Sequence, residues 1–296
     1  MRLTIMSRKV KGAIFALSLL IGVATASAQR FQPGEVLYYR AAYRALLVPN
    51  IEAGEVAVST KLDTLDGKAM YRVTGNGRTL SFFRWFFDMN DTYDIWVDKN
   101  TLRTQRFESN IKEDRYTFRS NYRYDWRAMK VHTWSQKLQE TPKEKTMPLT
   151  KESMDAVSLY FNLRSVDLES FSVGEHRELD MVLEDTIRNL KYRFIGREEL
   201  KVPRLGKFDT MKFACTIGSS EEFSFTDGTE FFIWITNDEN KIPVMLSSPV
   251  RVGEIRAYLR RYEGLRYPLT SWLDSEPEKA TTEQTHKPAI KPQQHE

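Results

Sequence analysis

The sequence predicts a mainly β fold, built from a long antiparallel meander of strands with one short helix packed on the sheet. Three observations predict it. Apolar residues alternate with polar ones through most of residues 29–274, turn-forming residues interrupt the alternation at short intervals, and one segment has apolar residues at helical spacing.

Strands are expected wherever the alternation is bounded by turns. Residues 56–62 alternate up to Asp66-Gly67, and the pattern resumes beyond this pair, which is typical of a β-hairpin. The same arrangement recurs around residues 98–100, 203–206 and 237–240. Turns at this spacing indicate about a dozen strands.

One short segment breaks the period-two rhythm. Residues 153–164 begin with Ser153, a residue type that caps helices, and they carry apolar side chains at helical spacing: Val157, Tyr160, Phe161 and Leu163. We expect a short amphipathic helix here, packed on the sheet.

A dense aromatic run occupies residues 80–89. It is too rich in aromatic side chains for a half-exposed strand, and three interpretations stay open: it fills the core, it forms a helical turn at the end of the sheet, or it covers an apolar cavity. If it lines a cavity together with the helix, the candidate ligand-binding residues are Phe82, Phe83, Trp85, Phe86, Phe87, Tyr160 and Phe161.

The first 28 residues have the layout of a secretory signal peptide. Basic residues precede an apolar run from Ala13 to Ala24, and Ala26-Ser27-Ala28 follows as a small-residue cleavage motif. We expect cleavage after Ala28 and export to the periplasm, and no lipid anchor because no cysteine follows Ala28. The apolar run is too short to cross a bilayer, which takes about 20 residues, so no transmembrane segment is expected in the mature protein.

The net charge of the chain depends on this leader. The chain has 44 basic and 40 acidic residues, and the leader holds four of the basic ones, so 40 of each remain after cleavage. A balanced charge argues against nucleic acid as a partner, and against a membrane role based on electrostatics alone. At the other end, residues 275–296 are rich in proline and polar residues, and we expect a disordered tail.

The search for catalytic chemistry yields little. The single cysteine, Cys215, lies in a predicted strand and is expected to be a buried structural thiol; His132 and His176 have no visible catalytic partner. Most acidic residues that stand out occur at turns, which their backbone preferences explain. We therefore expect no enzyme activity, no catalytic residue, no metal and no cofactor.

The domain organisation is expected to be simple. Residues 29–274 read as one mainly β domain, and residues 137–151, with two prolines and four lysines, are the place where it would divide into two halves.

Several segments resemble, in order, the landmarks of a known family: 34–39 (GEVLYY), 51–55 (IEAGE), 155–164 (DAVSLYFNLR), 195–199 (IGREE), 232–244 (FIWITNDENKIPV) and 252–255 (VGEI). The family is domain of unknown function family 3108, a group of exported bacterial proteins, and the resemblance spans about residues 31–265. It implies a periplasmic protein with a strongly curved antiparallel sheet or open barrel, and a fold-level likeness to periplasmic lipoprotein carriers. It brings no catalytic residues.

Three functions are compatible with these observations. The first is a non-catalytic binding module for a lipid or another apolar ligand of the cell envelope, and the second is a structural or protein-interaction component of the envelope. The third is a carboxylate-dependent glycan hydrolase. An apolar cavity beside residues 82–87 would favour the first, and a filled interior the second.

Overall fold

One antiparallel sheet dominates the part of the chain that the computed structural model describes, residues 29–45, 48–165, 167, 170–183, 186–218, 230–250 and 253–274. The expected signal peptide and the polar tail lie outside these residues. The sheet has 14 strands, and it is accompanied by the helix α1 (Ala156–Ser165) and the short 3-10 helix η1 (Ser81–Phe83). The prediction of a mainly β fold with one short helix is confirmed.

The sheet consists of two meanders, joined where one strand of the first pairs with one strand of the second. The first meander is β1 (Val36–Ala45), β2 (Val48–Leu65), β3 (Lys68–Thr79), β4 (Asn90–Asp98), β5 (Thr104–Glu113), β6 (Tyr116–Asp125), β7 (Lys130–Lys137) and β8 (Lys143–Pro148). The second is β9 (His176–Leu183), β10 (Thr186–Val202), β11 (Gly206–Ile217), β12 (Glu230–Thr236), β13 (Pro243–Pro249) and β14 (Glu254–Glu263). β14 pairs with β1 and joins the two meanders, so that β8 and β9 form the two edges of the sheet. Residues 137–151 carry β8 and the turns beside it.

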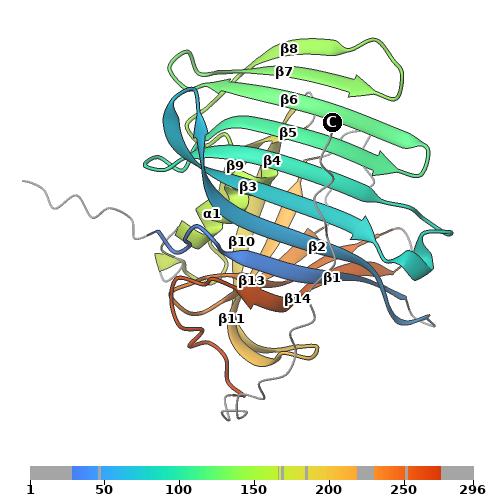
Figure 1. Cartoon of the computed structure of the whole chain (residues 1–296). Coiled ribbons are helices and arrows are strands. Elements are labelled where there is room, and N and C mark those ends of the chain that lie inside the picture. The colour runs from blue at the N-terminus through green and yellow to red at the C-terminus, as the bar shows by residue number, and fades with distance from the viewer. Residues whose placement is uncertain are drawn as a thin grey trace, which may run out of the picture.

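The sheet is strongly curved and wraps around α1, as Figure 1 shows. Leu159 and Leu163 of α1 pack on apolar side chains of β9–β12, while Phe161 packs on those of β3–β7. One helix therefore serves as the core of both meanders.

The segment between β8 and α1 brings the two edges of the sheet together. Met154 forms an isolated parallel bridge with Met181 of β9, in which the Met154 N–H donates to Asp180 O at 2.8 Å and the Val182 N–H donates to Met154 O at 2.7 Å. The chain thus leaves one edge strand and contacts the other before it becomes helical. β8 and β9 are not paired, and the barrel stays open.

The helix begins three residues later than the sequence predicted, and its cap is a different residue. Asp155 caps it, because its Oδ1 accepts a hydrogen bond from the Ser158 N–H at 2.9 Å. Ser153 instead accepts a bond from the Thr150 N–H at 2.8 Å and shapes the preceding turn. The prediction of Ser153 as the cap was wrong because the bridge to β9 holds Met154 extended. The side chain of Val157 lies outside the described part.

Large side chains pack between the helix and the sheet. Phe161 is fully buried, and its ring meets that of Phe31 at 4.4 Å between centroids. Arg164 is also fully buried on the same helix, where it forms an ion pair with Glu35, the residue just before β1. Within the described residues, no helix has the length and apolar character needed to cross a bilayer.

Candidate functional site

The residues that the sequence singled out lie in two separate places. Tyr160 and Phe161 belong to α1 inside the curve of the sheet, whereas residues 82–87 form the connection between β3 and β4 at one end of it (Figure 1). Phe82, Trp85 and Phe86 are 74%, 80% and 77% exposed. The interpretation of this run as core is therefore wrong, and the structure does not bring the two groups together.

The aromatic turn, residues 81–87, starts with the 3-10 helix η1 (Ser81–Phe83) and is firmly attached to the sheet. Within the turn, the Phe86 N–H donates to Phe83 O at 2.9 Å. Arg84 and Asp88 form an ion pair at 2.8 Å, and the Asp88 N–H donates to Asp114 Oδ1 at 2.8 Å. The turn therefore holds its exposed rings on an ordered backbone. Of the three interpretations of this run, the helical turn at the end of the sheet agrees with the structure.

The hollow beside the aromatic turn has a polar lining. It encloses about 500 Å³ and is bordered by Glu55, Arg78, Thr79, Leu80, Ser81, Arg84, Met89 and Asn90. It differs from the apolar cavity that a lipid carrier would need at this place.

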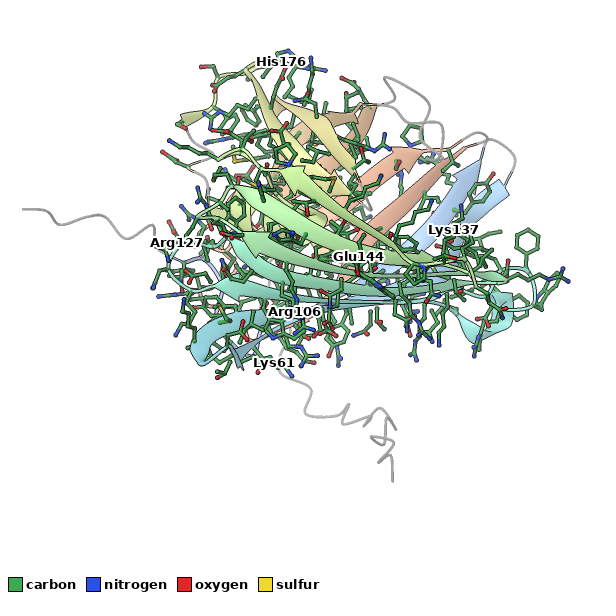
Figure 2. All side chains as sticks on the ribbon, turned by 90° about the horizontal axis from the view of Figure 1, so that it is seen from above. Lys61, Arg106, Arg127, Lys137, Glu144 and His176 are labelled. Atoms are coloured by element: carbon green, nitrogen blue, oxygen red, sulfur yellow. The ribbon has the colours of Figure 1, made fainter. Side chains whose placement is uncertain are left out.

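A second apolar side chain lies at the same end of the sheet. β3 and β7 both end there, and the turn from β7 to β8 exposes Leu138 to 44%. Figure 2 shows this end at Lys137, opposite the end marked by Arg127. The aromatic turn is thus the main part of an apolar rim at one end of the sheet.

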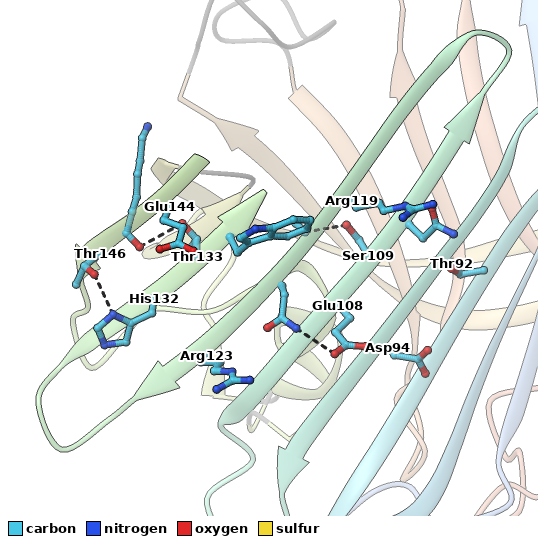
Figure 3. A pocket seen from close by; sticks show the side chains of 15 residues that line it. Thr92, Asp94, Glu108, Ser109, Arg119, Arg123, His132, Thr133, Glu144 and Thr146 are labelled. Carbon is cyan, nitrogen blue, oxygen red and sulfur yellow. Dashed lines mark hydrogen bonds between the residues drawn. The ribbon is translucent and has the colours of Figure 1, made fainter. Parts of the chain in front are cut away.

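A groove of about 700 Å³ crosses the outer face of β4–β8, on the side away from α1 (Figure 3). Arg106 marks this outer side in Figure 2. Side chains alternate between the two faces, so Ile95, Phe107 and Tyr122 point into the core while their neighbours along each strand point outward.

Strand register arranges the outward residues of β4–β8, most of which line the groove, in rows across the sheet. The central row runs Asp94, Glu108, Asn121, Trp134 and Glu144. A second row on one side runs Trp96, Arg106, Arg123, His132 and Thr146, and a third on the other side runs Thr92, Asn110, Arg119 and Gln136. Adjacent strands are about 4.8 Å apart, so the central row spans about 19 Å.

Two carboxylates of the groove, Asp94 and Glu108, are already paired with arginines. Asp94 pairs with Arg72 at 2.8 Å, and Glu108 pairs with Arg106 and accepts a hydrogen bond from Asn121 at 3.1 Å. Within the part of the chain that the structure describes, Arg119, Arg123 and Glu144 have no ion-pair partner, and the Trp134 indole N–H has no acceptor.

A third, smaller cavity of about 290 Å³ lies at the start of α1. Thr104 and Ser158 both hydrogen-bond Asp155, and the buried hydroxyl of Tyr124 has no partner there. Burial, with the nearby Asp155 carboxylate, raises the pKa of Tyr124 well above its usual range. The Asp155 carboxylate here caps the N-terminus of the helix.

The remaining candidate groups stay apart from one another. Cys215 is buried on β11, and burial together with the Glu230 carboxylate raises its pKa to about 12, so its thiol stays protonated. His132 lies in the groove, where its Nδ1 is 2.9 Å from Thr146 Oγ1, and His176 is exposed at the start of β9. Among the described residues, no three His, Cys, Asp or Glu side chains gather as metal ligands do.

Sequence reasoning missed the groove. The signal was present, because polar residues at every second position of 92–146 share one face once strands pair in register. The face was recognisable only with the register, which places Trp134 beside Asn121 and between Arg119 and Arg123.

The comparisons with known proteins agree with this fold. Among the solved structures that match is a β-barrel-like protein of domain of unknown function DUF1849 from Brucella abortus, with a TM-score of 0.52 at 8% identity over 79% of this chain and 98% of the other. At this identity the likeness concerns the fold alone. No curated protein matches the chain. The model of the family described as protein of unknown function (DUF3108) matches residues 38–260, most of the described domain, as its landmarks predicted. The chain belongs to the DUF3108 family.

Proposed function

We propose that this protein is an exported, non-catalytic binding module of the bacterial cell envelope that attaches to a lipid surface through its aromatic turn. One observation carries the proposal: Phe82, Trp85 and Phe86 stand almost fully exposed on an ordered turn at the tip of the sheet. Large apolar side chains exposed together mark sites of interaction with an apolar partner.

The energetics favour attachment. Transfer of one large apolar side chain out of water contributes about 1.5–3 kcal/mol to binding, and the three rings on this turn would be buried together. The turn is already held by Arg84, Asp88 and Asp114, so little conformational entropy is lost when it binds.

The chemistry of the turn suits the boundary between lipid and water. Tryptophan prefers this depth because its ring is apolar and its indole N–H is polar. Arg78 and Arg84 flank the rings; each is paired with a carboxylate, Glu55 or Asp88, but their side chains remain 63% and 56% exposed and can also contact phosphate headgroups. A chain balanced in charge cannot rely on electrostatics alone, so the aromatic side chains supply most of the affinity.

The packing of α1 favours this form of lipid binding over transport inside a cavity. Tyr160 and Phe161, expected as cavity lining, pack instead against the core and the buried Arg164. The lipid contact proposed here is therefore external, and the cleavable leader predicted for residues 1–28 would deliver the protein to the envelope.

Sedimentation with lipid vesicles tests the proposal. Purified protein is mixed with vesicles of phosphatidylethanolamine and phosphatidylglycerol, and we expect most of it to sediment with them. Replacing the three rings together (Phe82→Ser, Trp85→Ser and Phe86→Ser) should reduce the bound fraction at least tenfold.

A matched control removes exposed apolar side chains from the opposite end of the sheet. Val173→Ser and Leu62→Ser change side chains that are 72% and 53% exposed, and binding should stay unchanged. Equal loss in both variants, or no sedimentation of the parent protein, would contradict attachment through the turn. If the parent protein stays in the supernatant and binds a specific envelope protein that the triple variant does not bind, the turn would instead be a protein-interaction surface.

A further inference from the structure

We propose that the outer groove over β4–β8 binds an acidic saccharide, a chain of sugar units that carry carboxylate or phosphate groups. This site is separate from the aromatic turn, since the groove lies on the face of the sheet and the turn at its end. The inference does not depend on the function proposed above.

The shape of the groove suits an extended polar chain. Its volume is about 700 Å³, and its central row spans about 19 Å across five strands, which is room for several sugar units side by side. Short strands in regular register supply the row, so its groups stand on a rigid support.

The side chains in the middle of the groove suit sugar rings. Trp134 is half-buried with its N–H unpaired, and an indole face packs on the apolar C–H face of a sugar while its edge donates a hydrogen bond. Asn121 lies opposite it on β6, and Glu144 on β8, and both present planar groups to hydroxyls.

The unpaired charges specify an acidic ligand. Arg119 and Arg123 lie four residues apart on β6, about 13 Å, and flank the position of Trp134 on the neighbouring strand. Neither has a carboxylate partner in the described chain, and two carboxylates of the groove, Asp94 and Glu108, are held by Arg72 and Arg106. Two guanidinium groups are therefore left to bind anions.

The register places two arginines directly opposite each other, Arg106 on β5 and Arg123 on β6. Glu108 pairs with Arg106, whereas Arg123 has no carboxylate partner in the described chain, so Arg123 is the guanidinium left to bind an anion. Glu108 and Glu144 of the groove can accept hydrogen bonds from hydroxyl groups of the ligand. A sugar chain has such hydroxyl groups between its acidic groups, and a simple anion does not.

Titration calorimetry with the parent protein tests the inference without any variant. The probes are an oligogalacturonate tetramer, which has a carboxylate on each sugar, the neutral galactose tetramer, and inorganic phosphate. We expect the acidic tetramer to bind at least tenfold more tightly than either of the others, and the binding to weaken as salt is raised.

Variants then place the binding in the groove. Arg119→Gln, Arg123→Gln and Trp134→Ala should each weaken it about tenfold, whereas Trp134→Phe, which keeps an aromatic face, should lose much less. Arg127→Gln is the matched control, because Arg127 lies on the β6–β7 turn outside the groove and should have no effect. An unchanged melting temperature confirms that each variant folds.

The other outcomes overturn the inference. Equal affinity for the acidic and neutral tetramers would mean that Arg119 and Arg123 do not bind the acidic groups of the ligand. Phosphate binding as tightly as the acidic tetramer would indicate an anion site only. No binding of the tetramer, or full retention of its binding in the Trp134→Ala and Arg119→Gln variants, would mean that the groove is a solvated face of the sheet.

Discussion

Arg164 on the helix and Glu35 at the start of the first strand form a fully buried ion pair, although 129 residues separate them in the chain. Arg164 Nη2 donates to Glu35 Oε2 at 2.9 Å and to Arg30 O at 3.0 Å, and its Nε donates to Asn240 O at 3.0 Å. One guanidinium therefore ties the helix to the N-terminal segment and to the loop after β12. Burial raises the pKa of nearby Tyr160, so this phenol stays neutral beside the pair.

Removing one partner of the Arg164–Glu35 pair should destabilise the fold strongly. Glu35→Gln leaves a fully buried guanidinium without its counter-charge, and we expect the free energy of unfolding in urea to fall by about 3–5 kcal/mol. Arg84→Gln breaks an exposed pair and serves as the control, with an expected loss under about 1 kcal/mol. Equal small losses in both variants would mean that the buried pair contributes little.

Asp91 should make stability fall between about pH 4 and 6. Burial, helped by the Glu113 carboxylate and opposed by the bond that it accepts from the Lys112 N–H, raises its pKa to about 6. An unfolded carboxyl loses its proton near pH 4, so over this range the unfolded state binds fewer protons, and the folded state is progressively disfavoured up to pH 6.

Asp91→Asn removes this titration and keeps an oxygen for the Lys112 N–H. The variant should match the parent near pH 4 and be more stable by about 1–3 kcal/mol at pH 7. Urea unfolding of both proteins at several pH values measures the difference. A difference that is constant across the range would show that Asp91 does not titrate in this way.

Cys215 should be unreactive in the folded protein. Its burial and raised pKa keep the thiolate population very small, so a thiol reagent at pH 8 should label it only after unfolding in denaturant. Labelling of the native protein within minutes would show an accessible thiol and would reopen a redox role.

The leader should be removed after Ala28. Protein recovered from the periplasm of a bacterial host should have an intact mass that begins at Gln29, and Ala28→Arg should block this processing. Recovery of the uncleaved chain in the cytoplasm would contradict export.

The sequence predicted the fold class and the strands well, because period-two alternation and turn residues are local signals. It misplaced the helix start, since the bridge between Met154 and Met181 depends on a strand far away in the chain. It also could not foresee that Arg164 would be buried within an apolar helix face, because its partner Glu35 lies 129 residues earlier in the chain.

The candidate site was harder to predict than the fold. The aromatic run at residues 82–87 was visible in the sequence, but composition does not tell whether rings pack inward or protrude, and three of them protrude. The outer groove depends on register across five strands, which no local pattern contains. The residues of greatest functional interest therefore lie where tertiary structure, rather than local pattern, decides exposure.

The central claim is that Trp85 enters a lipid surface. Its fluorescence in the presence of phosphatidylethanolamine and phosphatidylglycerol vesicles, with bromine atoms on the acyl chains as quenchers, tests this most directly. The account predicts quenching of the parent protein that is largely lost in Trp85→Phe, while that variant still sediments with vesicles through the exposed rings of Phe82 and Phe86 and the aromatic ring kept at position 85. Quenching that is absent from the parent protein, or unchanged in Trp85→Phe, would contradict it.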